Sequence, residues 1–207
     1  MNFETFSDKL FLALKEKLPG QETQIKMLPK GRERNIPTNL ENVKKSAVML
    51  LCYFHENEIN IVLIKRANDN GKHSGQIAFP GGGVEIFDKD IFATAVRETN
   101  EEIGVSDIKT IGLLSPIFIP VSNYLMQPVL GVLKDKPKFT KSKDEVAEIY
   151  SVNINELIDA KIIRRTFTIN KEEVTAPFYI VKGVEIWGAT AMVLSEFIEI
   201  LKNIDLK

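Results

Sequence analysis

The chain has 207 residues, of which 44% are hydrophobic, and it carries a formal net charge of −1 at pH 7. This length suffices for one well-buried domain and permits two at most. Because the charge is nearly balanced, there is no broad basic field to attract nucleic acid or an anionic membrane, so both are excluded as main partners.

The first predicted element is an amphipathic helix that ends near Pro19. Its apolar residues recur at helical spacing: Phe3, Phe6, Leu10, Phe11, Leu14 and Leu18. The helix has few cations, so we expect its apolar face to pack on its own domain or on the partner of a homodimer rather than on a membrane. Residues 20–45 are rich in Lys, Arg, Asn, Pro and Gln and are predicted to form a connecting arm.

Two β-rich runs, 46–54 and 58–66, follow the arm and are predicted to form a hairpin. The first contains Cys52, the only cysteine, which we expect to be an inert core thiol rather than a nucleophile. A single cysteine cannot form an intrachain disulfide, which fits a reducing compartment and predicts cytoplasmic localisation. No stretch approaches the ~20 apolar residues that span a bilayer, and charges from Glu4 onward interrupt any signal-peptide pattern.

The second run ends in two cations, Lys65 and Arg66, directly before a loop. A planar guanidinium suits bidentate contact with phosphate oxygens, so Arg66 is a candidate phosphate contact, although cations at strand ends are often only solvated. The loop leads to the three glycines 81–83. Glycine reaches backbone angles closed to other residues and lets main-chain groups approach a ligand, which predicts a binding turn here.

An acidic helix is predicted next, with Asp88 or Asp90 as its N-cap and Gly104 as its end. Glu98, Glu101 and Glu102 follow Arg97 at spacings that place them on one helical face. Like charges at this spacing repel, and a divalent cation would compensate them, whereas the alternative is a solvated acidic surface. Carboxylate oxygens favour Mg²⁺ or Mn²⁺ over zinc.

The remaining elements alternate in a way that indicates α/β layering. Strands are expected near 107–118, 127–134, 144–151, 162–168 and 175–182, with a short helix from 153 and a final helix from about 188. Trp187 precedes the final helix and is expected to be a packing anchor. Tyr124 either stacks on a base or caps the core.

The glycine turn and the acidic helix resemble the signature of the Nudix hydrolases, which split a diphosphate linked to a nucleoside. The matching residues are Gly82, Arg97, Glu98, Glu101, Glu102, Gly104 and Val105. The chain departs from the signature in two places. Asp88 stands where the family has a glutamate and is followed by one extra residue before Arg97, and Thr99 replaces an aliphatic residue.

Further segments resemble the coenzyme A pyrophosphatases of that family. The segments are 63–66, 73–82, 127–131, 145–148 and 186–191. This resemblance implies a mixed central sheet in an α/β/α sandwich, with residues 1–45 as an N-terminal helix and arm and residues 46–207 as the Nudix domain. The implied reaction splits coenzyme A, or its derivatives, into adenosine 3′,5′-bisphosphate and 4′-phosphopantetheine or its acyl form.

The resemblance also implies residue roles. Glu98, Glu101 and Glu102, with a main-chain carbonyl near Gly82, would bind Mg²⁺ or Mn²⁺. Glu98 is the preferred base for the attacking water, with Glu101, Glu145 and Glu148 as alternatives. Arg97 would orient a glutamate by ion pairing. Substrate contacts are expected from Arg66, His73, Gln76 and Gly81, where His73 and Gln76 either shape the pocket or support the glycine loop.

Two alternatives keep the same fold. The first is hydrolysis of another small molecule, such as ADP-ribose, NADH or a modified nucleoside triphosphate. The second is a binding module without turnover. Such a module would be expected to lose acidic residues from the signature, whereas this chain retains all three glutamates and the arginine.

Overall fold

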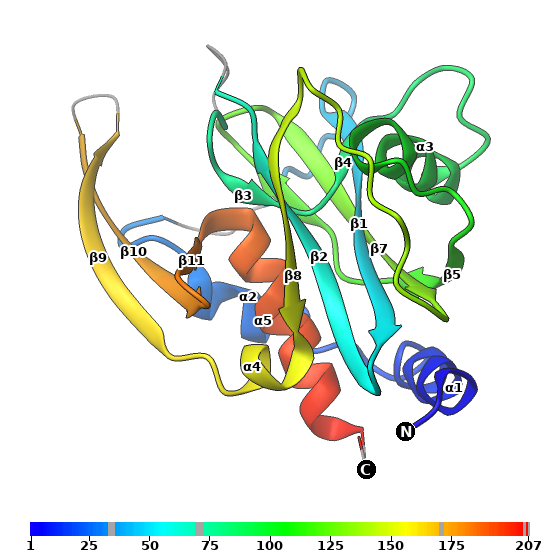
Figure 1. Cartoon of the computed structure of the whole chain (residues 1–207). Coiled ribbons are helices and arrows are strands. Elements are labelled where there is room, and N and C mark those ends of the chain that lie inside the picture. The colour runs from blue at the N-terminus through cyan, green and yellow to red at the C-terminus, as the bar shows by residue number, and fades with distance from the viewer. Residues whose placement is uncertain (33–35, 69–72, 170–171, 205, 207) are drawn as a thin grey trace.

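The computed structural model describes residues 1–32, 36–68, 73–169, 172–204 and 206. Figure 1 shows a large twisted sheet with helices on both faces and a smaller sheet beside it. This arrangement confirms the predicted α/β class and the sandwich around a mixed sheet. Within the described ranges, no helix is both long enough and apolar enough to cross a bilayer.

The helical elements are α1 (Phe3–Ala13), α2 (Gln21–Gln24), the 3₁₀ helix η1 (Ile25–Met27), α3 (Ile91–Ile103), α4 (Ile154–Ile158) and α5 (Gly188–Asn203). The first strands are β1 (Lys44–His55), β2 (Glu58–Arg66), β3 (Ile77–Ala78), β4 (Gly81–Gly83), β5 (Lys109–Leu113) and β6 (Ile117–Ile119). The later strands are β7 (Tyr124–Leu133), β8 (Val146–Asn153), β9 (Ile162–Ile169), β10 (Glu172–Val181) and β11 (Val184–Ile186).

The large sheet has the order β3-β2-β1-β7-β5, with β4 paired to β1, β6 to β7 and β8 to β2. The pairing of β1 with β7 is parallel, and the other pairings in this sheet are antiparallel. The smaller sheet is antiparallel and has the order β11-β10-β9. The large sheet is therefore mixed because of one long parallel pair at its centre.

The predicted hairpin of β1 and β2 is confirmed. Its turn residues Glu56 and Asn57 have φ values of 51° and 64°, and two left-handed residues give a turn whose twist matches the strands. The strands pair from His55 to Cys52 on the β1 side, and then β1 turns to β4 while β2 turns to β3. The segment containing β3 and β4 thus fills a split in the sheet, which places the glycine turn inside the fold.

Alternate residues of β2 face the two helical layers. Ile61 and Leu63 belong to the core cluster that includes α5, whereas Val62 and Ile64 belong to the cluster beneath α3. All four side chains are fully buried, which explains why β2 is almost continuously apolar. Cys52 on β1 is also fully buried, so the prediction of a core thiol is confirmed.

The predicted strand at 107–118 is instead two strands, β5 and β6. Their partner β7 contains Pro128, which has no N–H to donate, and the break between β5 and β6 lies opposite it. The side-chain amide of Gln127 donates to the carbonyl of Leu114 at 2.6 Å. The break therefore follows from the proline, and the glutamine satisfies a carbonyl beside it.

Two predictions about the N-terminal region are corrected. Helix α1 ends at Ala13 rather than near Pro19, although Leu14 and Leu18 still pack against the same core. The arm at 20–45 is not only a connection, because it forms α2 and η1 and buries Gln24 and Met27. Residues 33–35 of the arm lie outside the described residues.

The apolar face of α1 packs on its own domain. Phe6 and Leu10 are fully buried, and the rings of Phe3 and Phe6 meet Phe54 edge-on at centroid distances of 5.9 and 5.6 Å. This face was expected to pack either on its own domain or on a homodimer partner, and the structure shows that it packs on its own domain. The domain boundary at residue 45 stays a prediction.

Candidate functional site

The sequence of α3 fixes both of its ends. Asp90 Oδ1 accepts a hydrogen bond of 2.9 Å from the N–H of Ala93, and Gly104 ends the helix in the left-handed conformation with φ 73°. Asp90 rather than Asp88 is therefore the N-cap. Ala95 and Ile103 are fully buried against the sheet, which turns the opposite side of the helix toward the glycine turn.

Thr99, the departure from an aliphatic residue, is also fully buried. Its hydroxyl donates to the carbonyl of Ala95 at 2.6 Å, so the buried polar atom is satisfied within the helix. The substitution therefore leaves no polar group without a partner beneath the acidic face.

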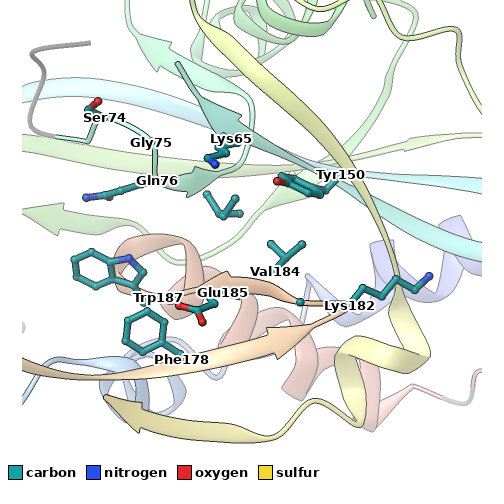
Figure 2. Close-up of a pocket in the computed structure, with 12 residues that line it drawn as sticks. Lys65, Ser74, Gly75, Gln76, Tyr150, Phe178, Lys182, Val184, Glu185 and Trp187 are labelled. Atoms are coloured by element: carbon teal, nitrogen blue, oxygen red, sulfur yellow. The ribbon is translucent and has the colours of Figure 1, made fainter. Parts of the chain in front are cut away.

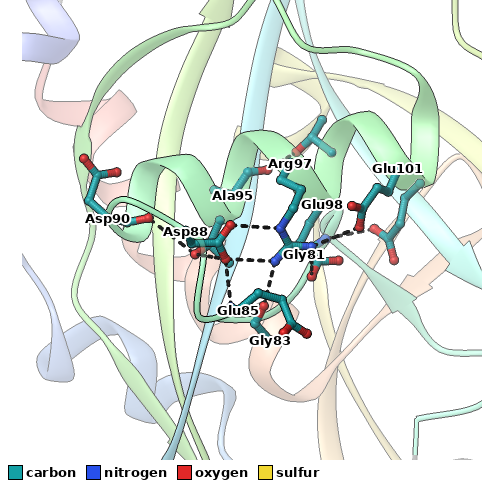
Figure 3. Close-up of polar contacts among 12 residues, drawn as sticks. Gly81, Gly83, Glu85, Asp88, Asp90, Ala95, Arg97, Glu98 and Glu101 are labelled. Carbon is teal, nitrogen blue, oxygen red and sulfur yellow. Dashed lines mark hydrogen bonds and ion pairs between the residues drawn. The ribbon is translucent and has the colours of Figure 1, made fainter.

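Arg97 connects the loop before α3 to the glutamates on it (Figure 3). Its Nε and Nη2 donate to the two oxygens of Asp88 at 2.9 and 3.0 Å, and Nη2 also donates to the carbonyl of Gly83 at 2.9 Å. Its Nη1 donates to Glu98 Oε1 at 2.9 Å and to Glu101 Oε2 at 3.0 Å. One guanidinium thus holds three carboxylates in place relative to the glycine turn.

Asp88 closes the loop in front of Arg97. Its Oδ2 also accepts from the N–H of Glu85 and from the hydroxyl of Thr94, both at 2.8 Å. The hydrogen bonds from Arg97, the largest effect, hold the pKa of Asp88 well below its usual range. The acidic residue that departs from the family spacing is therefore the partner of the arginine.

Glu102 is the most buried carboxylate of the site, with 1% of its surface exposed. The N–H of Gly81 donates to its Oε2 at 2.8 Å, and Arg66 Nη1 lies 3.7 Å from its Oε1. Burial raises the pKa of Glu102 to about 7, against the opposing effects of the Gly81 hydrogen bond and the Arg66 charge. Glu102 thus joins the helix to the glycine turn and to the end of β2.

Glu98 lies directly against Gly82. A Cβ atom at Gly82 would be 2.5 Å from the Glu98 carboxyl group, so only glycine leaves room for this side chain. Burial raises the pKa of Glu98, Arg97 opposes that rise, and the charges of Glu101 and Glu145 add to it. The glycine turn and this carboxylate are therefore packed as one unit.

The donor set fits a hard divalent cation by its chemistry. Glu98, Glu101 and Glu102 offer only carboxylate oxygens, which Mg²⁺ and Mn²⁺ prefer. Within the described part of the chain, no group of three or more His, Cys, Asp or Glu residues is already arranged to hold a metal ion. Burial disfavours the ionised forms of Glu98 and Glu102, and a bound cation would offset that cost.

The four residues predicted to contact substrate lie close together around the end of β2. The N–H of Arg66 donates to the carbonyl of Gln76 at 3.0 Å, and His73 Nδ1 lies 3.3 Å from Gln76 Oε1. Arg66 and Gly81 both contact Glu102. The predicted contact with substrate stays a prediction for all four.

The two downstream glutamates differ in their surroundings. The charge of Glu145 raises the pKa of both Glu98 and Glu102, so it lies within electrostatic reach of the site. Glu148 is exposed and accepts a hydrogen bond of 2.7 Å from the hydroxyl of Tyr150. Glu145 is therefore the nearer alternative base.

Tyr124 lies at the other side of the glycine turn. Its ring is 5.7 Å from Lys44 Nζ, and its hydroxyl would be 3.7 Å from a Cβ at Gly83. The choice between base stacking and capping of the core stays open for this residue.

A cavity of about 390 Å³ lies next to this site and was not predicted from the sequence (Figure 2). Its lining includes Lys65 of β2, Tyr150 of β8, Phe178 of β10 and Trp187, the N-cap residue of α5. The ring of Trp187 also packs on Phe178 at a centroid distance of 5.8 Å, so its predicted packing role is confirmed. These residues come together because β2 pairs with β8 in the large sheet and the small sheet lies beside that pair, and no local sequence pattern reports contacts between such distant segments.

Comparison with known proteins identifies the type of domain. The family model described as NUDIX domain matches residues 43–171. The uncharacterized Nudix hydrolase NudL of Pectobacterium atrosepticum is 30% identical over 172 residues, which cover 78% of this chain and 86% of that protein. The NudL protein of Cronobacter sakazakii is 30% identical over 161 residues, covering 74% and 81% respectively.

Solved structures share the fold at lower identity. The Nudix hydrolase RenU from M. Smegmatis has a TM-score of 0.55 at 13% identity, covering 87% of this chain and 96% of that chain. The MutT protein from Methanosarcina mazei Go1 has a TM-score of 0.53 at 16% identity, covering 81% of this chain and 100% of that chain. These likenesses concern the fold alone.

Proposed function

This chain belongs to the Nudix family of hydrolases, and from that premise we propose that it hydrolyses the diphosphate of coenzyme A and its derivatives. The products would be adenosine 3′,5′-bisphosphate and 4′-phosphopantetheine or its acyl form. One observation carries the substrate assignment. The segment that resembles the coenzyme A pyrophosphatase motif bonds to Arg66 through Gln76 and to buried Glu102 through Gly81.

The proposed cofactor is Mg²⁺ or Mn²⁺, held by Glu98, Glu101 and Glu102 with a main-chain carbonyl near Gly82. When bound, such an ion neutralises the negative oxygens of a diphosphate and makes a water molecule easier to deprotonate. Removing charge from the diphosphate is the main requirement of the reaction, because its oxygens otherwise repel a nucleophile.

The protein's own groups would then position and deprotonate the water. Among the hydrogen bonds of the described residues, Glu98 receives one on Oε1 from Arg97, which leaves Oε2 to accept a proton. Arg97 acts as a positioning residue, since its guanidinium is already shared by Asp88, Gly83 and the glutamates. Arg66 would meet a phosphate oxygen from the end of β2.

The substrate is tested by incubating the purified protein with Mg²⁺ or Mn²⁺ and, separately, coenzyme A, ADP-ribose, NADH and a nucleoside triphosphate. Products are resolved by mass. We expect coenzyme A to be cleaved fastest, with 4′-phosphopantetheine and adenosine 3′,5′-bisphosphate as products. Preferential cleavage of another compound would contradict the substrate assignment, and no cleavage with either metal would favour a binding module.

The proposed metal ligands are tested by Glu98→Gln and Glu102→Gln. Each substitution removes a charge without changing size, and we expect turnover of coenzyme A to fall by about 100-fold or more. Glu85→Gln is the matched control, because the Glu85 side chain is exposed on the adjoining loop. Full turnover in either of the first two variants would contradict the proposed site.

The remaining proposals concern assembly and compartment. Phe11 and Leu12 of α1 are 46% and 60% exposed, and we propose that they form a contact in a homodimer. Sedimentation should give a dimer for the wild type and a monomer for the double variant Phe11→Ser/Leu12→Ser, and equal masses would contradict this contact.

A reducing compartment such as the cytoplasm is proposed because Cys52 has no cysteine partner within the chain.

A further inference from the structure

The cavity between the two sheets is open and only partly apolar. Figure 2 shows Lys65 and Tyr150 from the large sheet facing Val184 and Trp187 from the small-sheet side, with Gln76 at one end. Its volume of about 390 Å³ is in the range of small-molecule sites. The cavity is therefore large enough for part of a substrate rather than for a whole coenzyme.

The aromatic wall of the cavity is rigidly supported. Trp187 is partly exposed, and its ring packs on Phe167 and Phe178 at centroid distances of 5.0 and 5.8 Å. Phe178 is only 6% exposed, so it supports the indole ring from the core. An aromatic ring that lines the cavity and is held by two neighbouring rings is suited to stacking on a base, because every base has a π face.

The cavity also has one cation without a salt bridge. Among the described residues, Lys65 makes no ion pair, whereas the Lys182 ammonium lies 3.1 Å from Glu156. Glu185, the acidic residue of the lining, is paired with Arg165. Lys65 is therefore the lysine of this cavity whose charge is left to bind an anion.

The cavity and the candidate metal site lie at the same end of β2 but on opposite faces of the large sheet. Successive residues of a strand point to opposite faces, so Lys65 points into the cavity while Arg66 points to Glu102, 3.7 Å away. A ligand that reaches both must pass around the end of the strand. An elongated molecule with a diphosphate near its middle meets this requirement.

We propose that this cavity binds the nucleoside end of the substrate, with the base stacked on Trp187 and a ribose phosphate bound by Lys65. The identity of the ligand rests on the proposed function, since the adenosine 3′-phosphate of coenzyme A supplies a base and a phosphate at the same end. In this arrangement the diphosphate reaches the glutamates around Arg66, and the pantetheine arm lies beyond them.

Trp187 is the only tryptophan of the chain, so its fluorescence reports on the cavity directly. The full-length protein, without added metal, is titrated with adenosine 3′,5′-bisphosphate and separately with AMP, which lacks the ribose 3′-phosphate. We expect a saturable change with both, and affinity about ten-fold higher for the bisphosphate. In Lys65→Gln that preference should disappear while AMP binding is retained.

Lys136→Gln is the matched control, because Lys136 lines a different cavity beside α1. It should keep the preference for the bisphosphate. Circular dichroism checks that each variant is folded. A third variant, Trp187→Phe, retains a ring for Phe167 and Phe178 to pack on. It should raise KM for coenzyme A more than it lowers kcat.

The outcomes separate this proposal from the proposed function. Cleavage of coenzyme A without a saturable fluorescence change, or with an unchanged preference in Lys65→Gln, would overturn the cavity assignment alone. Saturable binding that depends on Lys65, in a protein that does not cleave coenzyme A, would support the cavity and overturn the proposed reaction.

Discussion

For single residues, the main feature of the site is the close packing of the glycine turn, residues 81–83, against helix α3. The Glu98 carboxyl group occupies the volume that a side chain at position 82 would need. Glu102 receives the N–H of Gly81, and Arg97 binds the carbonyl of Gly83. Each glycine of the turn therefore has a different contact with α3.

Gly82→Ala should reduce turnover by about ten-fold or more, because its new Cβ would lie 2.5 Å from the Glu98 carboxyl and must displace it. Gly83→Ala is the control, since its Cβ would meet only the Tyr124 hydroxyl at 3.7 Å, an ordinary contact. Steady-state kinetics with saturating metal compares the two. Equal activities would show that the position of the Glu98 carboxyl is not important.

Asp88→Asn should lower the free energy of unfolding by about 2–4 kcal/mol at pH 6, because it removes the carboxylate charge that accepts two hydrogen bonds from Arg97 in a largely buried pair. The folded-state pKa of Asp88 is depressed, so its stabilisation is complete above the unfolded pKa of about 3.9 and is lost as pH falls toward the folded value. Urea unfolding should therefore show a difference between wild type and variant that is smaller by about 1 kcal/mol at pH 3.

Asp90→Asn is the control for that experiment. Asp90 caps α3 and is exposed, and asparagine caps a helix about as well as aspartate. Its effect on stability should be small at both pH values. A difference that does not shrink at low pH for Asp88→Asn would contradict the ion pair with Arg97 as the source of stability.

The residue pattern predicted part of this site and could not predict the rest. Helical spacing brought the three glutamates and Arg97 together, because those contacts are local. The pairing of Arg97 with Asp88 depends on where the loop turns back before α3. The cavity beside Trp187 depends on contacts between distant strands, for which one sequence carries no local signal.

At the scale of elements, the short helix α2 is attached to α5 by buried polar groups. The Gln24 side chain donates to Glu196 Oε2 at 2.7 Å and to the carbonyl of Ser115 at 3.2 Å. The Ser115 hydroxyl also donates to Glu196, at 2.7 Å, and both Gln24 and Glu196 are fully buried. These bonds convert the predicted connecting arm into a packed part of the helical layer.

Gln24→Ala should destabilise the protein by about 2–3 kcal/mol, because it removes a hydrogen bond to a buried carboxylate. Gln21→Ala, an identical substitution at an exposed position of the same short helix, should change stability by less than about 0.5 kcal/mol. Chemical denaturation of the three proteins measures both effects. Equal stabilities for the two variants would contradict a structural role of the network.

Most helices and strands are predicted by sequence periodicity, and each element that was not predicted has an identifiable physical reason. The hairpin, α3 and α5 were predicted because their apolar spacing and turn or capping residues agree. The short strand β11 was missed because three residues are too few to show a period. The short helices within residues 20–45 were not predicted because the buried polar residues of this arm resemble those of a solvated loop.

At the scale of the whole molecule, the chain closes its core with its own N-terminus. Phe6 and Leu10 of α1 belong to the same buried cluster as residues of β1, β2 and α5. The fold therefore joins segments that are almost the full length of the chain apart, and the stability of the core depends on α1.

Phe6→Ala should destabilise the protein by about 3–5 kcal/mol, because Phe6 is fully buried and a cavity would remain. Phe11→Ala removes the same ring from the same helix at a position 46% exposed, so its cost should stay below about 1 kcal/mol at a protein concentration low enough to dissociate the proposed dimer. Thermal unfolding of the two variants makes the comparison. Similar melting temperatures would show that α1 is not a necessary part of the core.

Cys52 gives the molecule a built-in probe of its own opening. It lies on β1 opposite Ile61 of β2 and Val132 of β7, and burial raises the pKa of its thiol above the usual value. The side chain of Cys52 belongs to the core cluster that includes residues of α1 and α5, so a disulfide reagent can reach its sulfur only when that packed layer opens. In the native protein without any label or substitution, the rate of thiol modification would therefore measure how often this core opens, and a ligand that binds the folded state should slow it in proportion to its occupancy.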